Sequence, residues 1–520
     1  MTLAVPRNFI LLAAFGVFTS SSFSQTWERE DVGFESVQSR ARDLANKPYE
    51  APKRDSLPAW MNELTYDQYR DIRFNPNQAL WAADKLPFTA MFFHPGYQYR
   101  QPVTLNEFTS THQQKIRLAE AFFNYGPLVN KRGDLPNDGG FAGFRLHAPL
   151  NSADYYDELI AFKDDGYWRA LGKNQHYGIS SRSLAVDTGI DGVTEEFPSF
   201  REFWLRKPNP EDTIAHIYAL LDGPSYSGAY QFKITPGVVT RVDVKAVLFA
   251  RRTVQRLGVA PMSSMFWFGE NSRRKFDDFR PEVHDSDGLA IRTGSGERIW
   301  RPISNDSGKL EFSMFEMEKC VGFGLLQRDR RFGAYEDAEA SYHLRPSLWV
   351  EPTSDWGPGR VVLMEIPTSN EFADNIAAMW EPATAYKAGD RVEFSYRQHW
   401  TMDEDPSQAD GRVVATRTGV REGQPEQRTV TVEFVGTALS QQNAQPLTPH
   451  VELLGAGSEK AKVQSINVQP MPDARFRLAF QIAPSTEGGK LSDIGPIELR
   501  CCLKRGENFL TETWVHRITP

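Results

Sequence analysis

The sequence predicts an all-β protein, with a large N-terminal β-sandwich followed by a small immunoglobulin-like β-sandwich. Three observations favour this fold class. Short runs of alternating apolar and polar residues fill much of the chain, and Gly, Pro, Asn and Asp separate them. The regular succession of strand and helix patterns that marks a parallel α/β fold does not occur. A chain of 520 residues also exceeds what one hydrophobic core usually serves, so we expect two domains.

The first predicted elements of the folded chain are a helix and a series of strands. One helical face before Pro48 carries four apolar residues, Phe34, Val37, Ala41 and Leu44. This spacing predicts a short amphipathic helix. In TRVDVKAVLF, residues 240–249, apolar side chains alternate with mostly polar ones, as in a half-buried strand. Runs of this type continue to about Leu363 and predict a large antiparallel sandwich.

A loss of pattern in EPATAYKAGD, residues 381–390, predicts the domain boundary. We expect the large sandwich over residues 25–381, a linker over 382–388 and the immunoglobulin-like domain over 389–520. The last segment contains RVEFSYRQHW, TVTVEFVG, ARFRLAFQI and ETWVHR, which read as strands. Their spacing fits a sandwich of immunoglobulin-like size.

The N-terminus has the features of a secretory signal peptide. Arg7 precedes an apolar run from Phe9 to Phe18, and small residues around Ser22 and Ser24 suit a signal peptidase. This run is shorter than the roughly 20 residues that span a bilayer. We therefore expect residues 1–24 to be removed, an exported chain that begins near Gln25, and no membrane-spanning segment.

Composition narrows the function classes. The chain has a net charge of −8, and nucleic-acid binding requires a basic surface. Nucleic acid is therefore not an expected partner. Aromatic residues make up 12% of the chain, as in sugar-binding surfaces and in large β cores. Cys320, Cys501 and Cys502 are too few for a disulfide framework and are expected to be structural, although one bond from Cys320 to the pair stays open.

Several catalytic signatures are absent from the sequence. The ten histidines are spread too widely for His-Glu-x-x-His or another compact zinc spacing. The Gly-x-Ser-x-Gly elbow, the phosphate-binding loop and the dinucleotide glycine fingerprint are missing as well. We expect no metal and no cofactor. Carboxylate chemistry or plain binding remains.

One segment rich in carboxylates is RPEVHDSDGL, residues 280–289, in which His284, Asp285 and Asp287 crowd a turn that ends in Gly288. In structural terms, such aspartates cap backbone N–H groups of a turn. In functional terms, they supply a catalytic carboxylate. Spacing alone favours the structural interpretation.

A second such segment is EIPTSNEFADNIAAMW, residues 365–380. Asn370 is placed to cap a short helix with Glu371 and Asp374 in its first turn, where the helix dipole favours negative charge. Alternatively, apolar neighbours shield Asp374, disfavour its ionised form and keep it protonated as a general acid. The pattern by itself favours the cap.

A resemblance to a known family bears on this choice. Eight ordered blocks carry it: GFAGFRLHAPLNS (140–152), HYGISSRSLAVDT (176–188), EEFPSFREFW (195–204), LGVAPMSSMFWFG (257–269), RPEVHDSDGL (280–289), VGFGLLQRDR (321–330), YHLRPSLWV (342–350) and EIPTSNEFADNIAAMW (365–380). These blocks resemble the periplasmic glucan biosynthesis proteins, the OpgG and OpgD family, over nearly the whole mature chain. The resemblance implies a periplasmic protein with a galactose-mutarotase-like sandwich joined to an immunoglobulin-like domain.

The resemblance also implies an activity and residue roles. Members include anomer-inverting enzymes that act on β-1,2-glucan. The aspartate of the Asp-Asn-Ile motif, here Asp374, would be the general acid, and the aspartate of the His-Asp-Ser motif, here Asp285, the general base. Inverting pairs usually lie about 6.5–9.5 Å apart, but this family passes the proton to its base through an intervening chain, so a larger separation is compatible with the assignment.

Further residues are expected to support this pair. If the segment is helical, Glu371 would lie close to Asp374 and raise its pKa. Tyr342 and Arg345 are expected to reach the substrate or the proton path. Further candidates for substrate binding or support are His284 and three tryptophans that could stack on sugar rings, Trp300, Trp356 and Trp380.

Alternatives to hydrolysis stay open. The segment RDRRFGAYEDAEASY, residues 328–342, is placed to cover the site, and such a cover decides whether water or a sugar hydroxyl attacks. A glucan transglycosylase with the same aspartates, or a noncatalytic glucan-binding factor beside a membrane glucosyltransferase, is therefore an alternative to an endo-β-1,2-glucanase. The oligomeric state is not fixed by the sequence, and a homodimer stays open.

Overall fold

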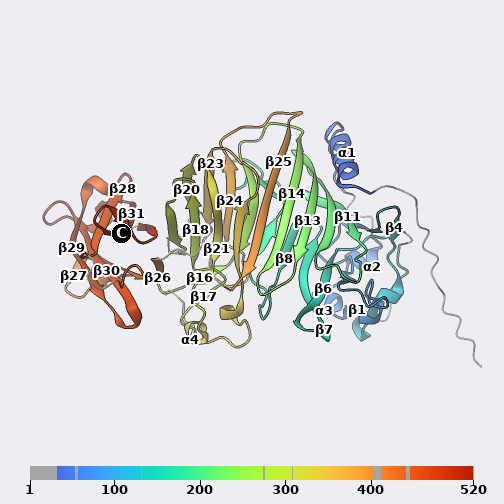
Figure 1. Ribbon diagram of the computed structural model, residues 1–520, viewed down its shortest axis with the longest axis horizontal. Coiled ribbons are helices and arrows are strands. Elements are labelled where there is room, and N and C mark those ends of the chain that lie inside the picture. Colours follow the sequence, from blue (N-terminus) through green and yellow to red (C-terminus); the bar gives the residue numbers. More distant parts are fainter. Residues whose placement is uncertain are drawn as a thin grey trace, which may run out of the picture.

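The computed structural model describes residues 32–52, 57–129, 132–136, 138–272, 276–306, 308–402, 411–440 and 445–518. The signal peptide expected at residues 1–24 lies outside this range. Strands dominate the described part, and they form a large sandwich with a smaller β region at one end (Figure 1). The expected all-β fold class is confirmed. Among the described residues, no helix is both long enough and apolar enough to cross a membrane.

Two sheets form the large sandwich. The first sheet contains, in spatial order, β2 (Thr89–Phe92), β6 (Gly143–Ser152), β7 (Tyr155–Lys163), β8 (Tyr167–Ala170), β9 (Ser180–Arg182), β15 (Leu257–Ser264), β24 (Ile376–Pro382), β23 (Gly359–Glu365) and β20 (Glu311–Met317), with β10 (Leu184–Val186) beside β15. The second sheet contains β4 (Gln113–Ile116), β3 (Thr104–Phe108), β11 (Ser199–Arg206), β12 (Ala215–Asp222), β13 (Tyr226–Thr235), β14 (Thr240–Ala250), β25 (Arg391–Thr401), β22 (Ser347–Pro352), β21 (Cys320–Leu326), β18 (Gly288–Thr293) and β19 (Arg298–Pro302).

The remaining elements are short or belong to the C-terminal region. The second sheet continues from β19 into β33 (Thr513–Ile518), β31 (Ile497–Arg505) and β28 (Thr448–Leu454), with β32 (Asn508–Phe509) beside β31. A separate sheet holds β26 (Arg412–Arg421), β27 (Gln424–Val435), β30 (Arg475–Pro484) and β29 (Ala461–Pro470). Two small pairs are β1 (Ile72–Phe74) with β5 (Phe123–Tyr125), and β16 (Phe266–Phe268) with β17 (Val283–His284). The α-helices are α1 (Phe34–Ala45), α2 (Ala59–Asn62), α3 (Tyr66–Arg70) and α4 (Phe332–Tyr335).

The two sheets of the large sandwich face each other across a core with a small polar link. The Trp168 indole of β8 donates to Gln398 Oε1 of β25 at 2.8 Å, and Gln398 Nε2 donates to Ser181 Oγ of β9 at 2.8 Å. All three side chains are buried, so these bonds satisfy polar groups that would otherwise be costly in the core. They link β8 and β9 of the first sheet to β25 of the second sheet.

The predicted helix and the predicted strand are both confirmed. In α1, Val37 and Ala41 are buried against the outer face of β12, β13 and β14. In β14, Val242 and Val244 point into the core, as the alternation indicates. The opposite face of β14 is not fully exposed to solvent, because Val247 on that face packs against α1. One helix therefore explains why this strand is apolar on both faces near its end.

The domain boundary expected at 382–388 is wrong. Strand β25 pairs with β14 from Thr240↔Trp400 to Phe249↔Arg391, and with β22 on its other side. Residues 391–401 therefore belong to the large sandwich. EPATAYKAGD starts with the last two residues of β24, and its other residues, 383–390, connect β24 to β25 of the same domain. Its loss of apolar pattern marks this surface loop. The smaller β region begins at β26.

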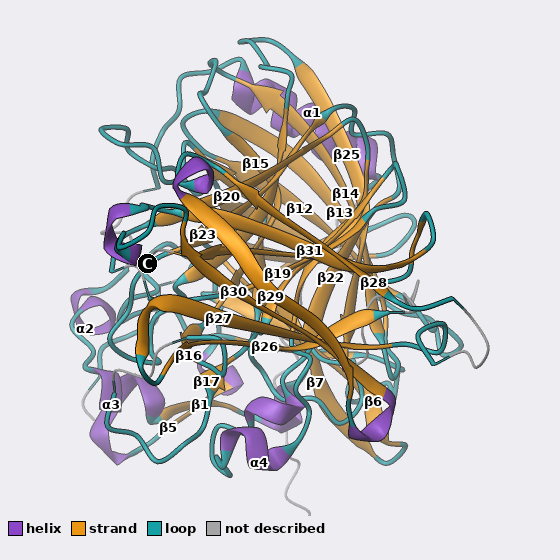
Figure 2. Ribbon diagram, turned by 90° about the vertical axis from the view of Figure 1, so that its left-hand side faces the viewer, coloured by secondary structure: helices purple, strands orange, loops and turns teal. Residues whose placement is uncertain are grey.

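The C-terminal region forms a small sandwich with its own core. Its two layers are the sheet of β26, β27, β29 and β30 (Figure 2) and the strands β28, β31 and β33. Strand β33 pairs in parallel with β19 through Ile299↔Thr513 and Trp300↔Trp514, so the large sheet extends into this domain. The three cysteines are buried free thiols: Cys320 lies in β21, and Cys501 and Cys502 in β31. The disulfide left open by the sequence is not formed.

A buried ion pair lies near the junction of the two domains, and its loss should lower the stability of the protein. The Arg301 guanidinium donates to Glu365 Oε2 at 2.9 Å, and both side chains are almost fully buried. Arg301→Met leaves the Glu365 carboxylate without its counter-charge, and we expect the free energy of unfolding to fall by about 3–5 kcal/mol. Urea denaturation followed by tryptophan fluorescence measures this loss. Arg331→Met, which removes an arginine that is 83% exposed, is the control and should change stability by no more than about 0.5 kcal/mol.

Candidate active site

The segment that carries Asp374 is a turn that leads into β24. The helix expected from Asn370 is wrong, because residues 371–373 form a turn and β24 begins at Ile376. Asn370 does cap the backbone, since its Oδ1 accepts a hydrogen bond from the Phe372 N–H at 2.9 Å. The same asparagine signal therefore starts a side-chain-capped turn in place of a helix.

Asn375 anchors this turn to the protein interior. Its amide is buried, and its Oδ1 accepts from the Phe266 N–H at 2.8 Å. Its Nδ2 donates to the carbonyls of Phe266 at 3.0 Å and Ile366 at 2.9 Å. One side chain thus joins the start of β24 to β16 and holds the neighbouring Asp374 in place.

The segment that carries Asp285 is attached to the same short strand. In the register of β16 and β17, Phe266 faces His284, and the Asp285 N–H donates to the Met265 carbonyl at 2.8 Å. The Asp285 carboxyl is buried, and Arg345 Nη1 donates to its Oδ1 at 2.5 Å. Strand β16 therefore carries both aspartate segments, one through Asn375 and one through β17.

The two carboxyl groups interact electrostatically. The surrounding protein raises the pKa of Asp374, although its side chain still has access to solvent, and Arg182, Arg169 and Arg345 oppose this rise. Burial also raises the pKa of Asp285; Arg345 opposes this effect and the Asp374 charge adds to it. The structure therefore brings Asp374, Asp285 and Arg345 together, and Arg345 acts on both acids. A carboxyl that tends to stay protonated beside a carboxylate paired with arginine is a suitable acid and base pair.

The other cations near Asp374 come from one face of the first sheet. In β8 and β9, Tyr167 pairs with Arg182 and Trp168 pairs with Ser181. Trp168 and Ser181 point into the core, so Tyr167, Arg169 and Arg182 point outward on the opposite face. Burial raises the pKa of Tyr167 and the charge of Asp374 adds to this rise, so this tyrosine lies within electrostatic reach of the acid. This outward face therefore meets the Asp374 turn.

Glu371 does not perturb Asp374 as expected. Its carboxylate accepts from Tyr342 Oη at 2.5 Å and from Arg280 Nη1 at 2.8 Å. Desolvation by the surrounding protein raises the pKa of Asp374 and nearby arginines oppose this rise, and Glu371 is not among the groups that shift it. Because the segment is not helical, Glu371 instead connects the acid turn to Tyr342, three residues before Arg345.

The three tryptophans expected to stack on sugar rings lie in hydrophobic cores. Trp300 is buried between the two domains, and the Arg328 guanidinium covers its ring at 3.5 Å from the centroid. Trp356 and Trp380 pack against each other with ring centroids 6.1 Å apart, and Trp380 has no exposed surface. None of the three presents a ring to solvent, so this structure does not place them at the site.

The segment expected to cover the site is fixed at both ends. Arg328 donates to Glu512 Oε1 at 2.7 Å and to Oε2 at 2.9 Å, which ties the segment to the C-terminal domain. Helix α4 then buries Tyr335, and Tyr342 forms the start of a 3₁₀ turn, Tyr342–Leu344. Packing therefore holds these parts of residues 328–342 beside the Asp285 segment.

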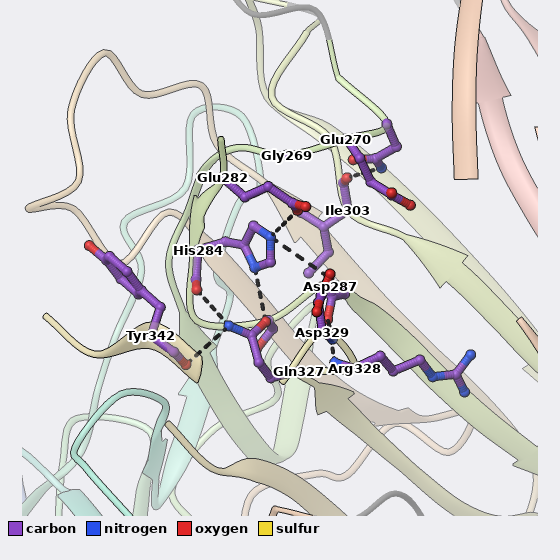
Figure 3. Close-up of polar contacts among 12 residues, drawn as sticks. Gly269, Glu270, Glu282, His284, Asp287, Ile303, Gln327, Arg328, Asp329 and Tyr342 are labelled. Carbon is purple, nitrogen blue, oxygen red and sulfur yellow. Dashed lines mark hydrogen bonds and ion pairs between the residues drawn. The ribbon is translucent and has the colours of Figure 1, made fainter. Parts of the chain in front are cut away.

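His284, which precedes Asp285 in the chain, lies in a buried polar cluster (Figure 3). Its Nδ1 is 2.9 Å from Gln327 Oε1, and its Nε2 is 2.9 Å from Glu282 Oε2 and 3.7 Å from Asp287 Oδ1. The Gln327 amide also reaches the backbone carbonyl of Tyr342 (Figure 3). The structural interpretation of this turn holds for Asp287, which accepts N–H groups of Arg328 and Asp329.

Comparison with known proteins identifies the family of the chain. Residues 32–518 match the family model described as "Periplasmic glucan biosynthesis protein, MdoG". The chain belongs to this periplasmic glucan biosynthesis family. It is 43% identical to glucans biosynthesis protein G of Rhodopseudomonas palustris strain BisA53, over 93% of this chain and 92% of that protein. It is 41% identical to the protein of the same name from Bradyrhizobium diazoefficiens, over 99% of both chains.

Membership of the glucan biosynthesis family confirms the resemblance read from the sequence. It carries a role in glucan biosynthesis and a periplasmic setting, as the family description states. A third relative, glucans biosynthesis protein G of Ralstonia nicotianae, is 43% identical over 94% of this chain and 96% of its own length. These names concern glucan synthesis and assign no reaction to individual residues.

Several residues of the site were not found from the sequence. Asn375, Gln327, Arg182 and Arg169 act on the segments or the charges of Asp374 and Asp285 through hydrogen bonds to backbone carbonyls or through charge. The fifth residue, Arg280, binds the Glu371 carboxylate. Four of the five lie within the blocks that carry the family resemblance. Their spacing along the chain matches no catalytic pattern, because their partners come from distant strands. The family blocks were the only feature of the sequence that pointed to four of these residues.

The role of Asn375 is testable by substitution. Asn375→Asp keeps the shape but replaces the Nδ2 donor by an oxygen that faces two carbonyls, so the turn shifts and Asp374 is misplaced. A misplacement of about 1 Å can cost about 10²-fold in rate, and we expect a loss of that order in the rate of a reaction that depends on Asp374. Circular dichroism and the melting temperature check that the variant folds. Asn370→Asp retains an acceptor for the Phe372 N–H and is the matched control; equal losses in both variants would contradict the anchoring role.

Proposed function

We propose that the protein is a periplasmic, anomer-inverting endo-β-1,2-glucanase that acts in glucan biosynthesis. Asp374 is the general acid, and Asp285 is the general base through a water and proton relay. One observation carries this proposal: two carboxyl groups on segments far apart in sequence interact through shared Arg345, one exposed and tending to stay protonated, the other buried and paired. Family membership supports the glucan as substrate.

The proposed chemistry follows from these two environments. Asp374 donates its proton to the glycosidic oxygen, which becomes the leaving hydroxyl. Water attacks the anomeric carbon from the opposite face, and its proton passes through the relay to the Asp285 carboxylate. Arg345 stabilises this carboxylate before the reaction. Tyr342 and Glu371 support the site through their mutual hydrogen bond.

The proposed partners are a β-1,2-glucan and a membrane glucosyltransferase that supplies it. The relatives are named for glucan biosynthesis, so an enzyme that trims or terminates the nascent polymer fits their naming. Export through the signal peptide expected at residues 1–24 would bring the protein to that polymer.

Product analysis tests the proposal. Purified protein is incubated with linear β-1,2-glucan, and products are separated by chromatography. Short linear oligosaccharides are the expected result. Cyclic or lengthened glucans would establish transglycosylation by the same aspartates, and intact polymer together with a raised melting temperature would establish a binding factor. Either of these outcomes would overturn the hydrolase.

The pH dependence of hydrolysis follows from the two raised pKa values. Asp374 must be protonated, so its raised pKa keeps the enzyme active above the pH at which an ordinary carboxyl has ionised. Asp285 must be ionised, so activity falls as pH decreases through its pKa, which is raised as well. We expect a bell-shaped profile of kcat/KM whose limbs belong to the coupled pair. A rate that falls from pH 4 upward, with no acid limb, would contradict these roles.

A further inference from the structure

The cluster of Glu282, His284, Asp287 and Gln327 (Figure 3) contains the residue that directly precedes the proposed base in the chain. The His284 imidazole is almost fully buried, between the Phe266 ring, stacked with centroids 5.2 Å apart, and the edge of Tyr335. Every polar atom of the imidazole has a partner in the cluster. The hydrogen bonds of this cluster determine the charge of His284.

Gln327 fixes the proton on one ring nitrogen. Its Nε2 lies 2.8 Å from the His284 carbonyl oxygen and 3.5 Å from the Tyr342 carbonyl oxygen, and only an amide nitrogen can donate to both. Gln327 Oε1 therefore faces His284 Nδ1 at 2.9 Å, and an acceptor in this position requires a proton on Nδ1. The tautomer follows from backbone contacts of Gln327 alone.

The second ring nitrogen faces carboxylates. His284 Nε2 lies 2.9 Å from Glu282 Oε2 and 3.7 Å from Asp287 Oδ1. An imidazole with protons on both nitrogens satisfies all these acceptors and compensates the buried negative charge. The carboxylates outweigh the effect of burial and raise the pKa of His284 to about 9. The charged and titratable groups around the cluster are Glu270, Glu282, Asp285, Asp287, Arg328, Asp329, Arg330, Tyr335, Tyr342 and Arg345.

This cluster is coupled to the base in two ways. The Gln327 amide joins the carbonyl of His284, the residue before Asp285, to the carbonyl of Tyr342, which begins the turn that precedes Arg345. Through this bridge it sets how Asp285 and Arg345 lie relative to each other. In addition, the His284 charge lowers the pKa of Asp285, against the effect of burial.

Resting on the proposed function, we infer that His284 is a positioning residue for the general base: as a buried imidazolium held by Glu282, Asp287 and Gln327, it keeps Asp285 aligned with Arg345 and ionised. The cluster thereby offsets the cost of an ionised carboxylate at a buried position.

The charge state is tested without reference to activity. In protein labelled with ¹⁵N-histidine, the His284 signals are identified by their loss in His284→Gln/Glu282→Gln. We expect both ring nitrogens to show protonated chemical shifts at pH 7.5, with no change on adding EDTA or Zn²⁺. A neutral tautomer at pH 7.5 would overturn the inference. So would a response to Zn²⁺, because the three groups would then bind a metal.

The positioning role is tested by the direction of change in the pH profile. Glu282→Gln removes a negative charge from the cluster, so the acid limb of kcat/KM should move to lower pH. His284→Gln/Glu282→Gln also removes the imidazolium, so this limb should move to higher pH than in Glu282→Gln, with a larger loss in kcat than in affinity. A purely structural role would shift both limbs equally or not at all. Equal profiles would overturn the inference even if hydrolysis is established.

The pH dependence of the melting temperature tests the charge of His284 independently of any enzymatic activity. His284 has an ordinary pKa of 6.5 and a folded-state pKa of about 9, so its contribution to stability is complete below pH 6.5 and is lost as pH rises through about 9. The melting temperature of the wild type should therefore exceed that of His284→Gln/Glu282→Gln most at pH 6 and least above pH 9. A difference independent of pH would overturn the buried imidazolium, whether or not the protein cleaves glucan.

Discussion

Asp374→Asn should abolish most hydrolysis of linear β-1,2-glucan while the protein still binds it. The asparagine keeps the shape of the carboxyl but has no proton to give to the leaving oxygen, so we expect kcat to fall by about 10²–10⁴-fold. Affinity for the glucan should stay within about tenfold, because the substitution removes an interaction used in the transition state. Kinetics of reducing-end release and calorimetric titration with a short glucan measure the two quantities.

Glu371→Gln is the matched control for this prediction. It removes a negative charge three residues away, but its amide still accepts from Tyr342 Oη and leaves Asp374 free to donate. We expect a much smaller loss in kcat than in Asp374→Asn. If Asp374→Asn kept full activity, or if Glu371→Gln lost as much, Asp374 would not be the proton donor.

Asp285→Asn should cause a comparable loss for a different reason. The asparagine Oδ1 still accepts from Arg345, but the neutral amide cannot take the proton that the attacking water releases. We expect kcat to fall by about 10²–10⁴-fold, with the acid limb of the pH profile abolished. Steady-state kinetics between pH 4 and pH 9 test this expectation.

A control variant and a double variant test whether Asp285 acts in the same step as Asp374. Glu339→Gln, an exposed carboxylate in the segment beside the site, should leave the kinetics unchanged. Asp374→Asn/Asp285→Asn should be little slower than the slower single variant, since residues that act in one step are not additive. Losses that multiply in the double variant would show that the two aspartates act independently.

Local periodicity predicted much of the fold, and its failures are non-local. The alternation in β14 and the apolar face of α1 depend on neighbours along the chain, so the sequence shows them. The place of β25 depends on its pairing with β14, about 150 residues earlier in the sequence. No local pattern records such a pairing, and a surface loop before β25 therefore looked like a linker.

The candidate site shows the same limit. The family blocks pointed to Asp374 and Asp285, and the structure places both within electrostatic reach of Arg345. The turn at Asn370 was mistaken for a helix because an asparagine that caps a helix also caps a turn. Tryptophan content did not distinguish a sugar-stacking ring from a core ring, and Trp380 belongs to the core. Asn375 was missed because its function is to bridge backbone groups of two distant segments.

The most direct test of the central claim is the anomeric configuration of the first product. Linear β-1,2-glucan is mixed with the protein in an NMR tube, and the proton signals of new reducing ends are followed before mutarotation equilibrates them. An inverting acid and base pair predicts that the α-anomer appears first. If the β-anomer appeared first, or if the polymer gave no new reducing ends, Asp374 and Asp285 would not act as an inverting pair.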